Sequence, residues 1–418
     1  MSPTPRAALL LAAAAALAAV TGPALAALVV VALLGALAVD ARAAGRPVEV
    51  ARRLPGTVAR GVPAEVEAEV SQADGPTLHH RLRQVVPPGL ELDPPEGVDR
   101  LAGTLLATRR GRHRVPPVAV RSRGPLGLAT WDRQGGGGGA EVLAFPDVVA
   151  ARRLAEAVRS GRLSAAGLRR RGPLGLGTEF ERVREYAPDD DVRQINWRAT
   201  SRLGRPMSNE YRVERDRDVL CVVDAGRLMA SPVADRTRLD VALDAAAAVA
   251  LVADVLGDRC GTLAFDDEVR RRMRPRRGGG GAAIRLLFDL EPRQRDADHE
   301  LAFRLVREAK RAWVLVLTDL LDEAAARSLV AAIPVLARSH AVAVASVLDP
   351  DVTALSSIVP ERSVDAYAAA AALEVFSARD RTAAQVRAAG AEIVEAQPDA
   401  LAAACVRAYL TAKARARL

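Results

Sequence analysis

Charged and aromatic side chains concentrate between Gly177 and Arg202, in a chain of 418 residues of which only 3% are aromatic. The forked guanidinium groups of this stretch could bind a partner's carboxylates or a phosphate group. The same mixed charges could instead form ion pairs that brace the segment against the rest of the protein. The consecutive residues Asp189–Asp191 lack the spacing and the glycine turn of a calcium loop. A contact surface and a structural brace are therefore the two interpretations.

The local pattern of this stretch predicts an extended arm followed by a helix. Pro188 ends the arm, and Asp189–Asp191 would cap the helix and place negative charge at the positive end of its dipole. Val192, Ile195 and Ala199 recur at helical spacing. One narrow apolar face of that helix should therefore dock on another element.

A second set of chemically capable residues follows two apolar runs that predict buried strands. Asp224 ends the run that begins at Val219, and Asp319 comes two residues after the run Trp313–Leu317. The carboxyl ends of parallel strands form the ligand edge of a sheet, so both carboxylates should lie there. Two carboxylates make a poor magnesium cage, and Arg227 is near enough in sequence to pair with one of them.

The sequence contains no recognisable catalytic signature. No Ser/His/Asp, Cys/His or zinc-type spacing occurs, and none of the five histidines lies beside a candidate nucleophile at a strand end. The runs Gly135–Gly139 and Gly278–Gly281 lack the Gly-Lys-Ser/Thr of a phosphate-binding loop. His79 and His80, adjacent on a strand, face opposite sides. We expect no enzymatic activity, and a hydrolase with an unrecognised site is the alternative.

Composition limits the class of partner. The chain carries a net charge of +8 with a pI near 10.1, and 50% of its residues are hydrophobic. Its basic residues are almost all arginines interleaved with acids, without stacking aromatics, so we expect no nucleic-acid partner. Binding of anionic lipid or nucleic acid through the arginines is the alternative. Cys221, Cys260 and Cys405 form no CxxC motif and predict free thiols in a reducing compartment.

The N-terminal region predicts a membrane anchor. Residues Ala7 to Val39 are 33 uncharged positions, interrupted at Thr21–Pro23. A single helix of this length would be about 50 Å long, against a hydrocarbon core of about 30 Å, so two helices fit better. Arginines on both flanks place both ends in the cytoplasm. The alternative is a signal peptide cleaved after Ala24–Ala26.

Two further regions follow from periodicity. From Pro47 to Phe145, alternating segments such as Glu65–Val70 and Leu78–Val86, separated by Gly/Pro turns, predict a small antiparallel β-sandwich of immunoglobulin-like architecture. After Val219, strands alternate with helices, which predicts an α/β domain with a doubly wound, mainly parallel sheet. The expected strands are Val219–Asp224, Gly261–Phe265, Trp313–Leu317, Ala341–Leu348 and Ala391–Val394; the expected helices are 237–256, 282–290, 301–310 and 399–413.

The stretch Gly177–Arg202 resembles the signature of the bacterial domain-of-unknown-function family 58 (DUF58), through its Glu-Phe, Val-Arg-Glu-Tyr and Ile-Asn-Trp elements. Asp189 stands where that family usually has glycine. Arg109–Arg112 and Gly124–Leu128 also resemble family features, and the resemblance covers nearly the whole chain. The motif residues expected to contact a partner are Glu179, Phe180, Arg182, Arg184, Glu185, Tyr186, Asp190, Arg193, Asn196, Trp197 and Arg202.

The resemblance implies four segments: a transmembrane hairpin at 1–45, a β-sandwich at 46–146, a linker with the signature arm at 147–215, and a von Willebrand factor A-like domain at 216–418. In A-type domains an Asp-x-Ser-x-Ser motif, a loop threonine and a later aspartate hold a divalent cation. Here Gly226 and Leu228 replace both hydroxyl ligands, and Arg274–Gly281 offers no such threonine. Asp224 and Asp319 are then remnants of a degenerate site, and no cofactor is expected.

The resemblance also implies a function. Such proteins are associated with MoxR-type AAA+ ATPases, so the chain is expected to be a non-enzymatic interaction module in the cell membrane. Its soluble domains would face the cytoplasm and act with the ATPase in assembly or maturation of envelope proteins.

Overall fold

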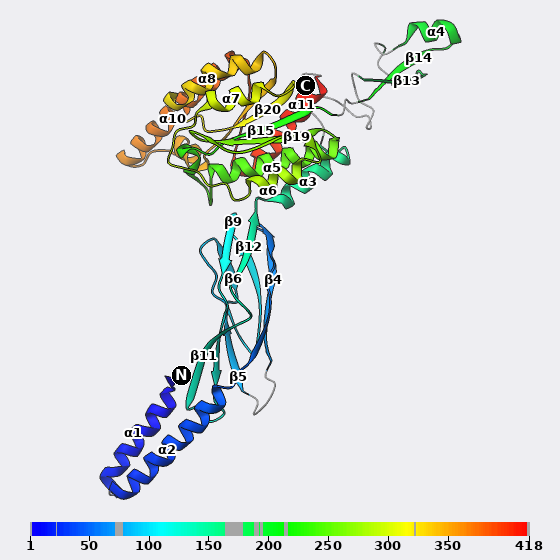
Figure 1. Ribbon diagram of the computed structural model, residues 1–418. Helices are drawn as coiled ribbons and strands as arrows, with labels where there is room; N and C mark the ends of the chain where they lie inside the picture. The colour runs from blue at the N-terminus through cyan, green and yellow to red at the C-terminus, as the bar shows by residue number, and fades with distance from the viewer. Residues whose placement is uncertain are drawn as a thin grey trace. The chain divides into compact units, whose positions relative to one another are not determined.

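The computed structural model describes residues 2–21, 23–71, 78–163, 179–187, 192, 195–212, 216–321 and 323–415. The chain forms two compact units, Met1–Phe145 and Pro146–Leu418. Of the residues described, those of the first unit form two helices and two β-sheets, and those of the second include a β-paired arm and a six-stranded sheet with helices (Figure 1). The predicted mixed α/β class is therefore confirmed.

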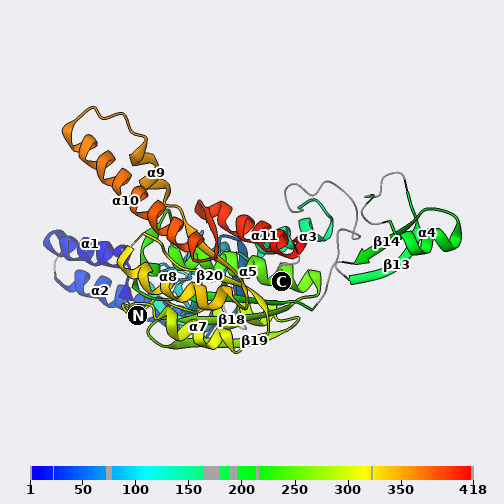
Figure 2. The same cartoon turned by 90° about the horizontal axis from the view of Figure 1, so that it is seen from above.

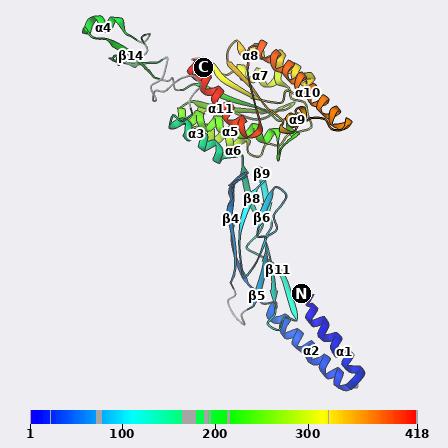
Figure 3. The same cartoon turned by 180° about the vertical axis from the view of Figure 1, so that it is seen from behind.

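The apolar N-terminal segment is divided into helices α1, Pro5–Thr21, and α2, Pro23–Ala44. Proline favours the first position of a helix, which explains why α2 begins at Pro23. The helices lie side by side (Figures 1 and 3). Among the described helices, α2 alone has a stretch, Ala27–Ala44, that is long and apolar enough to cross a membrane; the apolar part of α1, Pro5–Ala16, is shorter.

Two sheets follow the helices. The larger sheet has the order β1-β11-β10-β5-β7-β8-β4-β2, with β6 paired to β8, and the smaller has the order β3-β12-β9. Strand pairs are antiparallel apart from β3–β12, which is parallel. The strands are β1 Ser2–Pro3, β2 Glu49–Arg53, β3 Thr57–Ala59, β4 Ala64–Ser71, β5 His79–Arg83, β6 Leu90–Asp93, β7 Glu96–Val98, β8 Arg100–Ala107, β9 Gly111–Val115, β10 Val118–Arg123, β11 Ala129–Gly135 and β12 Ala140–Phe145.

Both sheets bury one face in a common core. Val66 and Leu82 of the larger sheet pack in the same cluster as Val115 and Val142 of the smaller one. Along each of these strands the buried residues occupy alternate positions, as the period-2 pattern predicted. His80 is buried, and its Nδ1 lies 2.8 Å from the Ser122 hydroxyl.

The second unit contains a six-stranded sheet in the order β19-β18-β15-β20-β21-β22. Five strands are parallel, and the edge strand β19, which the pattern did not predict, is antiparallel to β18. The strands are β15 Asp218–Asp224, β18 Arg259–Phe265, β19 Val269–Arg277, β20 Ala312–Leu317, β21 Ala341–Val347 and β22 Glu392–Ala396. A separate short hairpin consists of β16 Pro232–Val233 and β17 Arg236–Thr237.

Helices pack on both faces of this sheet (Figures 2 and 3). Phe303 of α7 and Leu329 of α8 share a core cluster with Leu220 and Leu263, whereas α5 and α6 face Cys221 and Thr262 from the other side. The region predicted as linker begins with a helix, α3, which packs on α5. The helices are α3 Val148–Arg159, α5 Arg238–Leu256, α6 Gly280–Leu287, α7 His299–Arg307, α8 Glu323–Ala337, α9 Pro350–Ser356, α10 Ser363–Ala388 and α11 Pro398–Ala414.

Candidate functional site

The signature motif contributes strand β13, Glu179–Glu185, and most of helix α4, Trp197–Leu203. Strand β14, Met207–Arg212, follows the motif and pairs antiparallel with β13. We call these three elements the arm. Tyr186 extends the pairing because its amide donates to the Pro206 carbonyl at 2.9 Å. Ile195 makes an isolated bridge to Ser208. The predicted extended segment is thus confirmed as a strand.

The predicted start of the following helix is wrong. Ile195 pairs as a β-bridge rather than lying in a helix, and α4 begins only at Trp197. The cap of α4 is Asn196, whose Oδ1 accepts from the Ala199 amide at 2.9 Å. The aspartates at 189–191, which were predicted to cap the helix, lie outside the described residues. Asn196 Nδ2 also donates to Asn209 Oδ1 at 2.7 Å, so one side chain joins the helix to β14.

The surface of α4 exposes large side chains. Trp197 is 68% exposed and Leu203 is 55% exposed. Arg198 and Arg202 are exposed on the same short helix. Arg205, just before β14, forms an ion pair at 3.6 Å with Glu185 at the end of β13. This pair joins two segments of the arm. The arm therefore combines internal bracing with an exposed aromatic and basic surface.

The other motif residues are placed as follows. Arg184 donates to the Glu185 carbonyl at 2.9 Å. Glu179, Phe180 and Arg182 belong to β13 through their backbone. Asp190 and Arg193 lie outside the residues that the structure describes.

At the carboxyl edge of the sheet, Asp224 is buried and both of its carboxylate oxygens accept hydrogen bonds. The Gly226 amide donates to Oδ1 at 2.7 Å, and the Thr318 hydroxyl donates to Oδ2 at 2.6 Å. Burial raises the Asp224 pKa from 3.8 to about 6, against the lowering effect of these two hydrogen bonds. Asp224 is therefore a carboxylate whose charge is poorly stabilised near neutral pH.

Asp319 is paired with an arginine, but not with the one suggested by the sequence. Arg227 makes an ion pair with Asp296, whereas the guanidinium Nη1 of Arg238 lies 3.2 Å from Asp319 Oδ1. Arg238 is the first residue of α5, and a capping box between Thr237 and Asp240 fixes that helix end beside the sheet edge. Burial raises the pKa of Asp319, and the nearby Arg238 charge opposes this rise.

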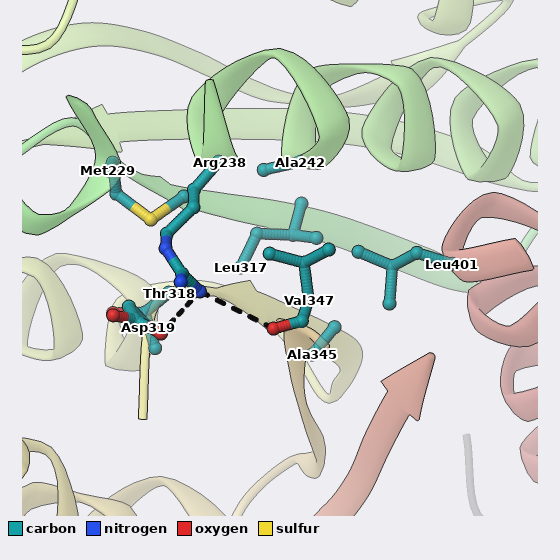
Figure 4. Close-up of a pocket in the computed structure, with 9 residues that line it drawn as sticks. All are labelled: Met229, Arg238, Ala242, Leu317, Thr318, Asp319, Ala345, Val347 and Leu401. Carbon is teal, nitrogen blue, oxygen red and sulfur yellow. Dashed lines mark hydrogen bonds and ion pairs between the residues drawn. The ribbon is translucent and has the colours of Figure 1, made fainter. Parts of the chain in front are cut away.

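A small cavity surrounds this pair (Figure 4). Arg238 reaches down from α5, between Met229 and the sheet edge, toward Asp319 and the Val347 carbonyl. A second buried arginine, Arg379 of α10, donates to the same carbonyl at 3.0 Å. The lining residues are Met229, Arg238, Ala242, Leu317, Thr318, Asp319, Ala345, Val347 and Leu401.

Both carboxylates at this edge are already bonded to other groups of the chain. The Asp319 carboxylate already faces a guanidinium, and Asp224 faces a hydroxyl and an amide. In the part of the chain that is described, no cluster of three His, Cys, Asp or Glu side chains could hold a metal ion.

Sequence reasoning missed Arg238 and Thr318. The available signals were the arginine that opens a mostly apolar helix and the threonine directly before Asp319.

The three cysteines take no part in either site. Cys221, Cys260 and Cys405 are free and buried, as their apolar surroundings predicted. The neighbouring Cys221 thiol and burial both raise the pKa of Cys260, and burial raises that of Cys405. Such thiols are poor nucleophiles at neutral pH.

Comparison with known families connects the arm and the sheet. The family model described as "Protein of unknown function DUF58" matches residues 182–394, slightly more than half of the chain. The chain belongs to the DUF58 family. The match begins in β13 and ends in β22, so in this DUF58 protein the arm and most of the α/β sheet form one family unit.

Curated relatives of the DUF58 chain occur in mycobacteria. Uncharacterized proteins of Mycobacterium tuberculosis strain H37Rv and of Mycobacterium bovis are each 31% identical to it over 104 residues. This match covers 25% of the chain and 33% of each relative. The similarity thus spans about one third of the relatives' length.

Proposed function

We propose that this DUF58 protein is a membrane-anchored, non-enzymatic interaction module whose arm binds another protein. The observation that carries the proposal is Trp197, which is 68% exposed at the start of α4. Exposed tryptophan and arginine side chains are the residue types that most often dominate binding at protein interfaces. Asn196 anchors this helix to β14, so the tryptophan is presented on a braced element.

The sheet of the second unit supports a von Willebrand factor A-like fold within this proposal. Asp224 ends β15 and Asp319 comes two residues after the adjacent parallel strand β20, at the edge where A-type domains hold a cation. In this chain Arg238 supplies the positive charge next to Asp319. We infer that the domain works without a metal ion and acts as a rigid scaffold.

The partner follows from the family resemblance. A MoxR-type AAA+ ATPase acting in envelope protein assembly or maturation is the partner we propose. The anchor would be the α1–α2 hairpin, with α2 supported by its length and apolar composition. Arginines on both flanks of the hairpin favour soluble units that face the cytoplasm.

The arm proposal is tested by co-purification from detergent-solubilised membranes with the full-length chain. Trp197→Ala should lose the ATPase, and Tyr367→Ala should retain it. Tyr367 is a suitable control because it is 78% exposed in the same unit but lies on α10. Loss of the ATPase from both folded variants, or from neither, would show that the arm is not the contact.

Orientation is tested with a membrane-impermeant maleimide. The native thiols are buried, so a cysteine placed at the exposed Ser357 gives a clean signal. Ser357→Cys should be labelled only after the cells are opened. Labelling in intact cells would place the α/β unit outside the cytoplasm.

A further inference from the structure

The ends of both N-terminal helices are bonded to one loop of the first unit, Gly124–Ala129. Near the end of α2, the Asp40 carboxylate is fully buried and accepts hydrogen bonds of 2.7 Å each from the amides of Leu126, Leu128 and Ala129. Before α1, the Thr4 hydroxyl donates to the Gly127 carbonyl at 2.7 Å. These hydrogen bonds hold the ends of both helices against the loop between β10 and β11 of the larger sheet.

A second set of contacts closes the same junction. Arg133 of β11 donates to the Ala44 carbonyl at 2.7 Å, which caps the carboxyl end of α2. Gly45 leaves little room for a side chain, because a Cβ there would lie 3.2 Å from the Trp131 ring. The helices and the larger sheet thus meet in a bonded, close-packed joint (Figures 1 and 3).

Four arginines surround this joint with their side chains exposed. They come from both helix ends and from the strand before the loop, and we call them the arginine collar: Arg6, Arg42, Arg46 and Arg123. Among the described residues, Asp40 offsets at most one of these four charges, and Asp132 is already engaged in a two-point ion pair with Arg121. The joint therefore carries an excess of positive charge.

Two partly exposed apolar side chains lie near the arginine collar. Leu126, in the loop, is 55% exposed, and Trp131, on β11, is 36% exposed. Tryptophan beside arginine is the composition expected where a protein crosses from the headgroup layer into the hydrocarbon layer. The uncharged run of α2 ends at Val39, directly before Asp40 of this joint.

We propose that the arginine collar is a binding site for the phosphate groups of anionic phospholipids. This inference rests on the membrane anchoring in the proposed function, and not on the arm or its partner. Arginine forks match phosphate oxygens in geometry and charge, and a basic cluster next to a membrane helix favours anionic lipid. A lipid fits better than an acidic protein because the exposed Leu126 and Trp131 lie among the arginines.

The test uses the full-length protein in nanodiscs made of equal parts phosphatidylcholine and phosphatidylglycerol. Native mass spectrometry then counts the two lipids that remain bound after release. The wild type should retain phosphatidylglycerol in roughly tenfold preference, from the combined attraction of several basic residues. The triple variant Arg42→Gln/Arg46→Gln/Arg123→Gln should lose most of this preference, and the corresponding triple lysine variant should keep much of it.

A matched control removes the same charge elsewhere in the same unit. Arg109, Arg112 and Arg114 are exposed around β9, at the end of the sandwich away from the helices (Figure 1). The triple glutamine variant of these residues should leave the lipid preference unchanged. An equal loss in the control, or no preference in the wild type, would overturn the collar and leave its arginines as topology signals only. Failure of the wild type to enter nanodiscs would overturn the anchor and the collar together, without bearing on the arm.

Discussion

The guanidinium Nη1 of Arg238 lies 3.2 Å from the Asp319 carboxylate, and both side chains are almost fully buried. The two residues are 81 positions apart, and a helix start and a strand end bring them together. This pair occupies the sheet edge where related architectures bind ligands. The charge balance of that edge is thus provided by the chain itself.

Removal of Arg238 should strongly destabilise the second unit. Arg238→Gln leaves the buried Asp319 carboxylate without its main counter-charge, at an expected cost of about 3–5 kcal/mol in the free energy of unfolding. Denaturant unfolding of the full-length protein in detergent measures this cost. Arg227→Gln is the control, because Arg227 and Asp296 are both largely exposed and their pair should contribute less than about 1 kcal/mol.

The same pair allows a test of mechanism. Asp319→Asn removes the uncompensated charge, so adding it to Arg238→Gln should restore part of the lost stability. If the double variant is as unstable as the sum of the two single variants, Arg238 acts through packing and not through its charge.

Asp224 should make the stability of the protein depend on pH. Its pKa is raised by burial from 3.8 to about 6, so between these values the folded state binds more protons than the unfolded state. Its contribution is complete below about pH 4 and is lost as the pH rises through 6, a change of about 3 kcal/mol. Asp224→Asn mimics the protonated form. As the pH rises from about 4 to 6, the free energy of unfolding of this variant should therefore increase relative to that of the wild type.

The measurement is the difference in unfolding free energy between Asp224→Asn and wild type at several pH values. Using the difference removes the contribution of other groups, notably His299, whose pKa burial lowers to about 4 and which therefore reduces stability as the pH falls below 6.5. Asp235→Asn, which changes an exposed carboxylate, is the control. A difference for Asp224→Asn that does not change with pH would mean that burial does not raise the Asp224 pKa.

Asn196 should control the order of the arm. Asn196→Ala loses both the helix cap and the bond to Asn209, so amides of α4 and β14 should exchange faster with solvent by a factor that corresponds to about 1 kcal/mol or more. Hydrogen exchange with mass spectrometry measures this. Asn196→Asp keeps the cap acceptor but cannot donate to Asn209, so protection should survive in α4 more than in β14. Equal exchange in all three proteins would rule out this bracing.

Gly124 should tolerate no side chain. A Cβ at this position would lie 2.3 Å from the Asp40 carboxyl carbon, so Gly124→Ala must displace the loop or break its bonds to Asp40. We expect a lower thermal midpoint in detergent, of the size caused by losing a buried hydrogen-bond group. Gly56→Ala is the control because nothing lies within 4 Å of its added Cβ. Similar midpoints for both variants would show that the joint is loose.

Local periodicity was sufficient for the five parallel strands and for helices α5, α6, α7 and α11, whereas α3, α8, α9 and α10 were not predicted. Alternation predicted the buried face of β4 at Val66 and Ala68, and continuous apolar runs predicted β15 and β20, because burial repeats with the geometry of each element. The antiparallel edge strand β19 was missed because its arginine-rich sequence has no apolar period. Edge strands can carry such charge since one side of their backbone is open to solvent.

The candidate sites depended on contacts between distant residues. The sequence by itself determined that Asp224 and Asp319 end two buried strands, and that Trp197 and its arginines share one short segment. Only the tertiary structure decided that Arg238 rather than Arg227 pairs with Asp319, that Asn196 caps α4, and that Asp40 binds the loop at 126–129. Residue type and spacing report local burial, whereas the choice among several arginines or caps depends on which of them the folded backbone brings within hydrogen-bond distance.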